Sequence, residues 1–411
     1  MNTRERIMAV LSGESPDHLP FTTWCFGFQP PEFLRWKNNE KEVMFWYTKR
    51  LEHLHTLPQE WTLDDDFRRV LAWRKVGIDD FLEISVPWSI DPAVTWRETT
   101  IPVGKMDERY PVMIRDYATP AGELRHAVRK TGEDPGAGWV IQPDTVPLIE
   151  DYNIPRAIKH AVASPADVDK LRYLYMPPDD NAKRWFKERA QRVVEFAAKE
   201  GVPVQAWAGF GMDAVVWFCG TEGAVMLALD ELQAFHRLWD IITETDLARV
   251  ALASAIDGID LVCERGWYSS TDFWSPSLFN EYVFPHVKQL VDVAHRHGKK
   301  FAYVMTTGVE LLGPRLADAG VDLLYFIDPF QDKISLEKIK ELLSERMTLV
   351  GGLNSTFLTN AKDDEVRIHV KRVIEVLGPS NRFILHPVDA LFPDTPWHSV
   401  ETAIKAWEEF R

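Results

Sequence analysis

The sequence predicts an α/β protein with a single (β/α)8 barrel domain spanning residues 1–411. Its length and its hydrophobic fraction of 45% are sufficient to bury a large core. Short apolar runs alternate with amphipathic helical segments through the second half of the chain. This alternation indicates parallel strands, because a parallel connection needs a crossover and a helix supplies it. Eight such strands would close a barrel.

The eight predicted strands follow the chain in order. They are expected at residues 19–24, 77–84, 203–208, 258–264, 300–305, 320–326, 347–352 and 382–387. Residues from about 91 to 145 break the rhythm with Thr-, Arg- and Pro-rich alternation, which predicts β-hairpins inserted after the second strand. No low-complexity tract or linker divides the chain, so we expect one domain.

Composition narrows the function classes. A net charge of -15 and a pI near 5.3 disfavour nucleic-acid binding, which calls for clustered basic residues. The N-terminus has no apolar segment of the signal-peptide kind, and the longest apolar run, 214–219, is far shorter than a membrane span. Three widely spaced cysteines fit a reducing compartment. We expect a cytoplasmic protein without a membrane partner.

Four sequence landmarks resemble those of the uroporphyrinogen decarboxylase superfamily. They are residues 4–20, residues 275–279 with Pro285, Gly351–Asn354 and Ile384–Pro387. The resemblance extends from Arg4 to nearly the C-terminus. This superfamily includes corrinoid-dependent methyltransferases as well as the haem-pathway decarboxylase. The resemblance implies a TIM barrel with its active site at the C-terminal ends of the strands.

Departures from the haem-pathway decarboxylase argue against uroporphyrinogen as the substrate. The segment that holds substrate carboxylates in that enzyme is rich in arginine, but here residues 24–30 contain none. The position of its catalytic aspartate falls near Val86. Without guanidinium groups, an acidic protein lacks the bidentate bonds that recognise a substrate with many carboxylates.

The zinc-dependent methyltransferases of the superfamily bind zinc through a His-x-Cys pair and a later Cys. These positions align with Met305, Thr307 and Asp389, so that thiolate-rich zinc centre cannot form here. A different metal set of Glu264, His386 and Asp389 stays open, because these are hard or borderline ligands near strand ends. Zinc is therefore left undecided.

The same three residues are the catalytic candidates. Glu264 ends the fourth strand, where it would act as a general acid or metal ligand; the alternative is an ion pair with Arg265. His386 ends the eighth strand and would protonate a leaving oxygen, or it is a core residue. Asp389 would orient His386, or it caps a loop or helix.

Aromatic and polar residues near strand ends are the substrate-binding candidates. The aromatic rings would favour a flat apolar ligand. Asp328 is also a candidate turn residue, and Asn354 would orient the substrate through its side-chain amide. The candidates are Trp24, Phe26, Trp88, Trp207, Trp267, Asp328 and Asn354.

The leading hypothesis is a methyltransferase that moves a methyl group from a small, methoxylated aromatic donor to a separate corrinoid protein, as in O-demethylases. The alternatives are a lyase that decarboxylates a small acid in an apolar pocket and a barrel that binds a ligand without turnover. A corrinoid on a partner protein is the expected cofactor, and a homodimer is left open.

Overall fold

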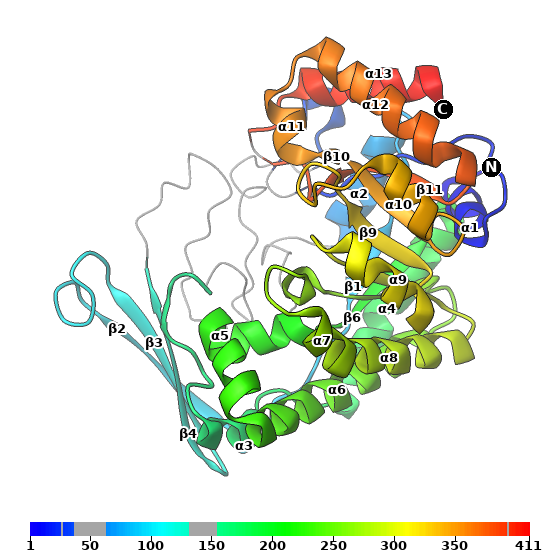
Figure 1. The fold of residues 1–411 in the computed structure, drawn as a ribbon. Helices are drawn as coiled ribbons and strands as arrows, with labels where there is room; N and C mark the ends of the chain where they lie inside the picture. The colour runs from blue at the N-terminus through cyan, green and yellow to red at the C-terminus, as the bar shows by residue number, and fades with distance from the viewer. Residues whose placement is uncertain (26–27, 37–62, 131–153, 393) are drawn as a thin grey trace.

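A curled parallel sheet of seven strands forms the centre of the structure (Figure 1). The computed structural model describes residues 1–25, 28–36, 63–130, 154–392 and 394–411. The strand order is β1-β6-β7-β8-β9-β10-β11, and all neighbours are parallel. The bounds are β1 Leu82–Ser85, β6 Val204–Gly209, β7 Leu261–Glu264, β8 Lys300–Val304, β9 Leu323–Ile327, β10 Thr348–Asn354 and β11 Phe383–Val388. Seven of the eight predicted strands are therefore present.

The segment predicted as the first strand makes isolated bridges in place of a regular strand. Phe21 bridges Leu385 of β11, and the Thr22 N–H donates to the Leu385 carbonyl over 3.0 Å. On the other side, the Asp79 N–H donates to the Phe21 carbonyl over 2.8 Å. Pro20 brings no N–H to a ladder. The prediction of eight regular strands is wrong for this one, although the segment still links β11 to the chain that leads into β1.

Helices connect the parallel strands and cover the outer face of the sheet (Figure 1). Local sequence fixes their ends: Asp179 caps the start of α4 by accepting from the Ala182 N–H, and Gly201 ends it with φ 65°. The helices are α1 Thr3–Ser12, α2 Leu63–Arg74, α3 Val168–Leu171, α4 Asp180–Glu200, α5 Gly211–Asp230, α6 Leu232–Ser254, α7 Pro276–Leu278, α8 Phe284–Arg296, α9 Val309–Ala319, α10 Leu336–Leu343, α11 Ser355–Asn360, α12 Asp363–Leu377 and α13 Trp397–Phe410.

One described helix, α5, is long and apolar enough to cross a membrane by length and composition alone. Its apolar window has a mean hydropathy of 1.4, but 67% of that window is buried inside the protein. A helix that is apolar on all sides is also what a large core requires. The burial of α5 therefore accounts for its composition.

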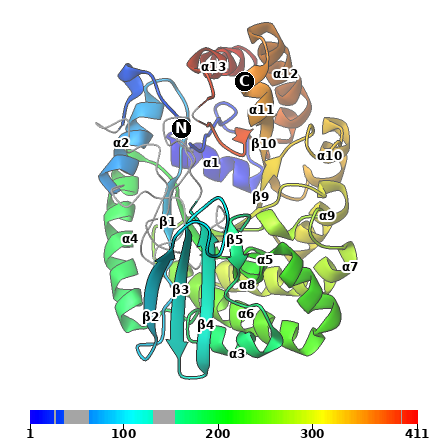
Figure 2. The ribbon, with the colours of Figure 1, turned by 90° about the vertical axis from the view of Figure 1, so that its left-hand side faces the viewer.

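An antiparallel sheet of four strands lies beside the parallel one (Figure 2). Its strands are β2 Thr95–Ile101, β3 Val112–Thr119, β4 Gly122–Arg129 and β5 Ala157–Lys159, in that order. The first three lie in the region from 91 to 145 where hairpins were predicted. The last part of that region, 131–145, is outside the described residues.

Helix α1 covers the N-terminal ends of the strands. Arg6 Nη1 lies 2.6 Å from Asp79 Oδ1 just before β1, and Arg4 Nη2 lies 2.7 Å from Asp260 Oδ1 just before β7. The Thr348 hydroxyl at the start of β10 donates to the Val10 carbonyl over 3.0 Å. These contacts cover the N-terminal end of the sheet, so a site can open at the carboxyl end.

Replacing Arg6 by methionine should lower the free energy of unfolding by about 3 kcal/mol, because it leaves the Asp79 carboxylate buried without its cationic partner. Urea denaturation at neutral pH measures the loss. The control is Arg192→Met, whose pair with Asp64 is more than half exposed and should contribute less than about 1 kcal/mol. Equal losses in the two variants would contradict the role of α1.

Candidate active site

The strand register identifies the side chains on the inner face of the sheet. Residues paired between parallel neighbours point to the same side. Glu83 pairs with Gln205, and Trp207 pairs with Cys263. The Tyr325 hydroxyl of β9 donates to Gln205 Oε1 of β6 over 3.1 Å, although two strands separate β9 from β6. This bond must cross the space that the sheet encloses, so these side chains face the barrel interior.

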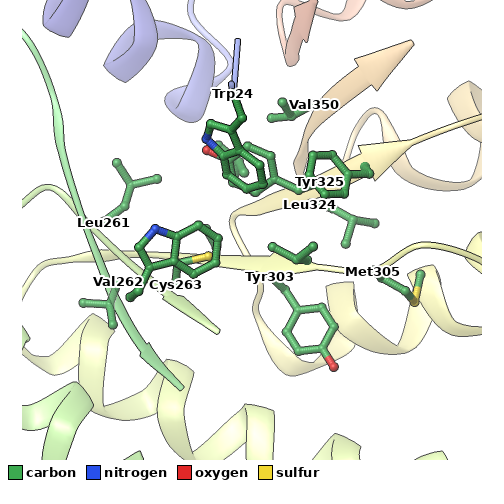
Figure 3. Packing of buried hydrophobic residues seen from close by; sticks show 14 of the residues in the cluster. Trp24, Leu261, Val262, Cys263, Tyr303, Met305, Leu324, Tyr325 and Val350 are labelled. Carbon is green, nitrogen blue, oxygen red and sulfur yellow. The ribbon is translucent and has the colours of Figure 1, made fainter. Parts of the chain in front are cut away.

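Five aromatic residues meet at the carboxyl end of this interior and are called the aromatic cluster: Trp24, Trp207, Trp267, Tyr325 and Phe326. The Trp24 ring stacks on Tyr325 with centroids 4.8 Å apart (Figure 3) and meets Phe326 edge-on at 4.9 Å. Trp207 stacks with Trp267 at 6.0 Å. Trp267 is half-buried. The structure thus brings together the predicted Trp24, Trp207 and Trp267.

His386 adjoins the aromatic cluster. Its Nδ1 lies 2.8 Å from the Thr22 hydroxyl, and its ring centroid is 5.4 Å from that of Trp24. Its Nε2 is buried and has no hydrogen-bond partner among the described residues. Burial lowers the pKa of His386 to about 3, because the charged ring would lose its hydration. The imidazole is therefore neutral at physiological pH.

Glu83 is an acidic group inside the barrel that the sequence prediction missed. It is half-buried, and its Oε1 accepts a hydrogen bond from Gln205 Nε2 over 3.3 Å. Burial raises the pKa of Glu83 to about 8, against the opposing positive charge of Arg69. The carboxyl group is therefore largely protonated at neutral pH and can donate a proton or a hydrogen bond.

The sequence does contain an indication that Glu83 is functional, but the prediction considered only polar residues at the ends of strands. Glu83 lies within a strand, between the buried Leu82 and Ile84. An acidic residue inside an apolar strand must be paired, neutral or functional, because an isolated buried charge is costly. The family comparison placed the acidic position near Val86, three residues further along the chain.

Glu264 faces the outer helices, so the predicted convergence of Glu264 with His386 and Asp389 is wrong. Strand alternation sends the side chain after the inward-facing Cys263 to the opposite face. Glu264 Oε1 lies 3.3 Å from His286 Nε2 on α8, and His286 Nδ1 lies 2.9 Å from the Thr243 hydroxyl on α6. The alternative ion pair of Glu264 with Arg265 is not seen either, because Arg265 pairs with Asp213.

The predicted metal set of Glu264, His386 and Asp389 does not assemble. Within the described part of the chain, no group of three or more His, Cys, Asp or Glu side chains could hold a metal ion. Asp389 is half-buried directly after β11. The described residues therefore do not fit a zinc ion.

Asp328 and Asn354 meet each other at the carboxyl end of β9 and β10. Asn354 Nδ2 donates to Asp328 Oδ2 over 2.6 Å. Asp328 Oδ1 also accepts from the Phe330 and Gln331 N–H groups, and Asn354 Oδ1 caps α11 by accepting from the Phe357 N–H. These bonds fix the loops that follow β9 and β10. For Asp328, this is the turn-forming role that the sequence left open as the alternative.

Of the other two predicted aromatic residues, only Trp88 can be placed, and it lies away from the aromatic cluster. Trp88 packs against Tyr175 and Phe210, with ring centroids 5.9 and 6.1 Å away. It is 2% exposed and belongs to the core behind the loop that follows β6. Phe26 lies outside the described residues.

A buried network holds the loops that surround the site. Asp246 Oδ2 of α6 accepts hydrogen bonds from the Phe210 and Gly211 N–H groups over 2.8 and 2.9 Å, and Asp246 Oδ1 accepts from the Tyr175 hydroxyl over 2.6 Å. Arg249 donates from Nε and Nη2 to the Val86 carbonyl. The chain segments after β6 and β1 are therefore fixed by the same helix.

Glu264→Gln should flatten the pH dependence of stability. Burial raises the pKa of Glu264, while Glu264 and Asp246 raise the pKa of His286 against the opposing effect of its burial. Both groups therefore bind their protons more tightly in the folded protein than in the unfolded chain. The stability that they contribute is lost as the pH rises above their pKa values in the unfolded chain, which are about 4.3 for the carboxyl group and about 6.5 for the imidazole.

The measurement is the free energy of unfolding between about pH 5 and about pH 9. The control is Glu188→Gln on the exposed face of α4. An unchanged pH slope in Glu264→Gln would show that the buried pair is not coupled to folding.

The sequence model of the uroporphyrinogen decarboxylase (URO-D) family matches residues 146–410. A methyltransferase from Methanosarcina mazei superposes with a TM-score of 0.57 at 15% identity, covering 100% of this chain and 99% of that chain. This match shows a shared fold. A D-psicose 3-epimerase from Clostridium cellulolyticum H10 reaches only a TM-score of 0.34 at 12% identity, over 55% of this chain and 83% of that one, and does not bear on the fold. No curated protein matches the chain. The family match covers more than half of the sequence, and it includes every strand of the parallel sheet except β1. The chain therefore belongs to the uroporphyrinogen decarboxylase family.

Proposed function

We propose that this protein is a methyltransferase that moves a methyl group from a small, methoxylated aromatic donor to a corrinoid carried by a partner protein. The observation that carries the proposal is the combination of the aromatic cluster with the protonated Glu83 carboxyl group on the same inner face. Membership of the family and the full-length fold match to a methyltransferase support it.

The aromatic cluster suits a flat and uncharged donor. Trp24 and Trp207 keep 8% and 7% of their surface exposed, and Trp267 and Glu83 are half-buried. Indole rings bind a flat apolar ring through contact area and stacking. At neutral pH, His386 is uncharged and Glu83 is largely so. A neutral aryl ether would therefore be favoured over a substrate with several carboxylates.

Glu83 supplies the proton that the leaving group needs. As the bond between the methyl carbon and the ether oxygen breaks, the bonding electrons stay on the oxygen and the methyl carbon bonds to the nucleophile. The Glu83 proton passes to that oxygen, so no free phenolate forms in the apolar interior. Gln205 orients the Glu83 carboxyl group through its amide, and His386 Nε2 offers a second contact to the donor.

A corrinoid would supply the strong nucleophile that accepts the methyl group. Aromatic side chains at the described carboxyl end of the barrel would favour stacking with a large planar macrocycle. Trp267 and Tyr268 are half-buried there, and Phe330 in the loop after β9 is 49% exposed. The cytoplasm is the proposed location, because three widely spaced cysteines fit a reducing compartment.

A lyase is the second candidate, because the same Glu83 could protonate the carbon left after loss of CO2 from a small acid. A barrel that only binds its ligand is the third. The three functions differ in their products, so one assay separates them.

Incubating the protein with methoxylated arenes and a reduced corrinoid should yield the demethylated phenol together with a change in the cobalt absorption spectrum. Chromatography of the phenol and visible spectroscopy measure both. Release of CO2 from small aromatic acids, without any change at cobalt, would support the lyase in place of the methyltransferase. Ligand binding without any product would leave only the binding barrel.

Glu83→Gln should lower the demethylation rate by between about 100-fold and about 10,000-fold, because the amide cannot supply the proton. The wild-type rate should fall as pH rises above about 8, where Glu83 ionises, and the residual rate of the variant should lack this fall. Initial rates across the pH range measure both. The matched control, Glu188→Gln, should keep the wild-type profile, and a wild-type rate and profile in Glu83→Gln would exclude Glu83 as the acid.

A further inference from the structure

Two consecutive hydrogen bonds cross the barrel interior and end at Glu83. The Tyr325 hydroxyl of β9 donates to Gln205 Oε1 over 3.1 Å, and Gln205 Nε2 donates to Glu83 Oε1 over 3.3 Å. Tyr325 and Gln205 are completely buried. Glu83 and Gln205 are register neighbours on β1 and β6, whereas Tyr325 reaches Gln205 from across the interior. The Gln205 amide therefore lies between the proposed acid and a phenol.

The Gln205 amide could bridge these two groups in either of two orientations. A side-chain amide accepts through its oxygen and donates through its nitrogen. In the structure the nitrogen faces Glu83, so the amide donates to the carboxyl group and the O–H of that group stays free. In the reversed orientation the amide oxygen would face Glu83 and accept its proton in a hydrogen bond. That proton would then be withheld from a leaving oxygen.

The Tyr325 hydroxyl favours the orientation seen in the structure. Burial raises the pKa of the Tyr325 phenol above its usual range, so the hydroxyl keeps a proton to donate. Gln205 Oε1 accepts that proton only while the amide oxygen faces β9. Reversing the amide would take this acceptor away from a completely buried donor, which is costly.

We propose that Tyr325 is a positioning residue that holds the Gln205 amide in the orientation that leaves the Glu83 proton free for the leaving oxygen. The inference rests on the proposed function, because it takes Glu83 as the acid. Its second consequence needs no substrate. An amide N–H facing Glu83 stabilises the ionised carboxylate, whereas an amide oxygen in its place would stabilise the protonated group. The Tyr325 hydroxyl therefore lowers the pKa of Glu83 through Gln205.

Other groups also act on the Glu83 carboxyl group and have to stay constant in the test. Burial has the largest effect on its pKa and raises it. Tyr325→Phe leaves these groups in place and keeps the ring that stacks on Trp24, so this variant isolates the hydroxyl. The described groups that face Glu83 are Arg69 and Asp66 of α2, Asp80, Trp207 and Cys263.

The test titrates Glu83 in the intact protein by difference infrared spectroscopy. The band of the protonated carboxyl group is assigned by its loss in Glu83→Gln, and its wild-type midpoint should lie at about pH 8. Tyr325→Phe should raise the midpoint by about one pH unit, because the amide can then turn its oxygen to Glu83. The demethylation rate of this variant near neutral pH should fall about tenfold, although the acid is still present. A purely structural role would lower the rate without moving the midpoint.

The matched control is Tyr303→Phe. Tyr303 is also a completely buried strand tyrosine, and its hydroxyl lies 2.6 Å from the Ser269 hydroxyl. This variant should keep the wild-type midpoint and rate. In a Gln205→Met background, Tyr325→Phe should not move the midpoint, because the amide through which Tyr325 acts is gone. If Tyr325→Phe does not fold, a ring-fluorinated tyrosine at the same position keeps the hydroxyl as a stronger donor and should lower the midpoint.

The outcomes distinguish this inference from the proposed function. An unchanged midpoint in Tyr325→Phe would overturn the inference and leave the proposed function standing. An equal shift in the Gln205→Met background would also overturn it, because Tyr325 would then act on Glu83 by another path. If the midpoints move as expected but the wild type demethylates no methoxylated arene, the orientation of the amide by Tyr325 is supported and the proposed function fails.

Discussion

Strand alternation at the carboxyl end of the parallel sheet is the constraint on which the rest of the site depends. Each strand offers every second side chain to the interior, and parallel register extends that choice to its neighbours. Glu83, Gln205, Trp207 and Cys263 consequently share the inner face, while the residue after Cys263 joins the polar contacts beneath the helices. One carboxyl group therefore faces the barrel interior and the other packs beneath the helices, although both lie on neighbouring parts of one sheet.

Burial then gives the inner face its chemistry. The same loss of hydration raises the pKa of the Glu83 carboxyl group and lowers that of the His386 imidazole, so both favour their neutral forms near pH 7. A net charge of -15 on the whole chain therefore says little about this interior. The interior therefore combines uncharged hydrogen-bonding groups with aromatic rings, an environment in which a buried charge would be costly.

The sequence predicted the fold more fully than the site. Strands such as β9 and β11 could be found because their apolar runs alternate with helices, a pattern that depends only on local sequence. The prediction of a regular strand at 19–24 was wrong because strand formation also depends on hydrogen bonds to neighbouring strands, and the local sequence does not show where those neighbours lie. Trp24, Trp207 and Trp267 could be singled out because each lies near a strand end, and the structure brings these three rings together. The prediction that Glu264 faces the site was wrong because β7 is buried on both faces. The hydropathy pattern of this strand therefore could not show to which side its last side chain points.

Buried residues of α5 and α6 determine where the Trp267 ring lies at the carboxyl end of the barrel. Asp246 holds the start of α5 at Phe210 and Gly211, and that same helix presents Asp213 and Trp217 to Arg265. The position of the Trp267 ring therefore depends on α6 through α5 and Arg265, a path of buried hydrogen bonds and of contacts between the guanidinium and the indole rings. Such contacts are costly to bury unless every partner is in place. The contacts that join α6 to α5 and α5 to Arg265 therefore favour a wall held in one position, which precise placement of side chains in a site requires.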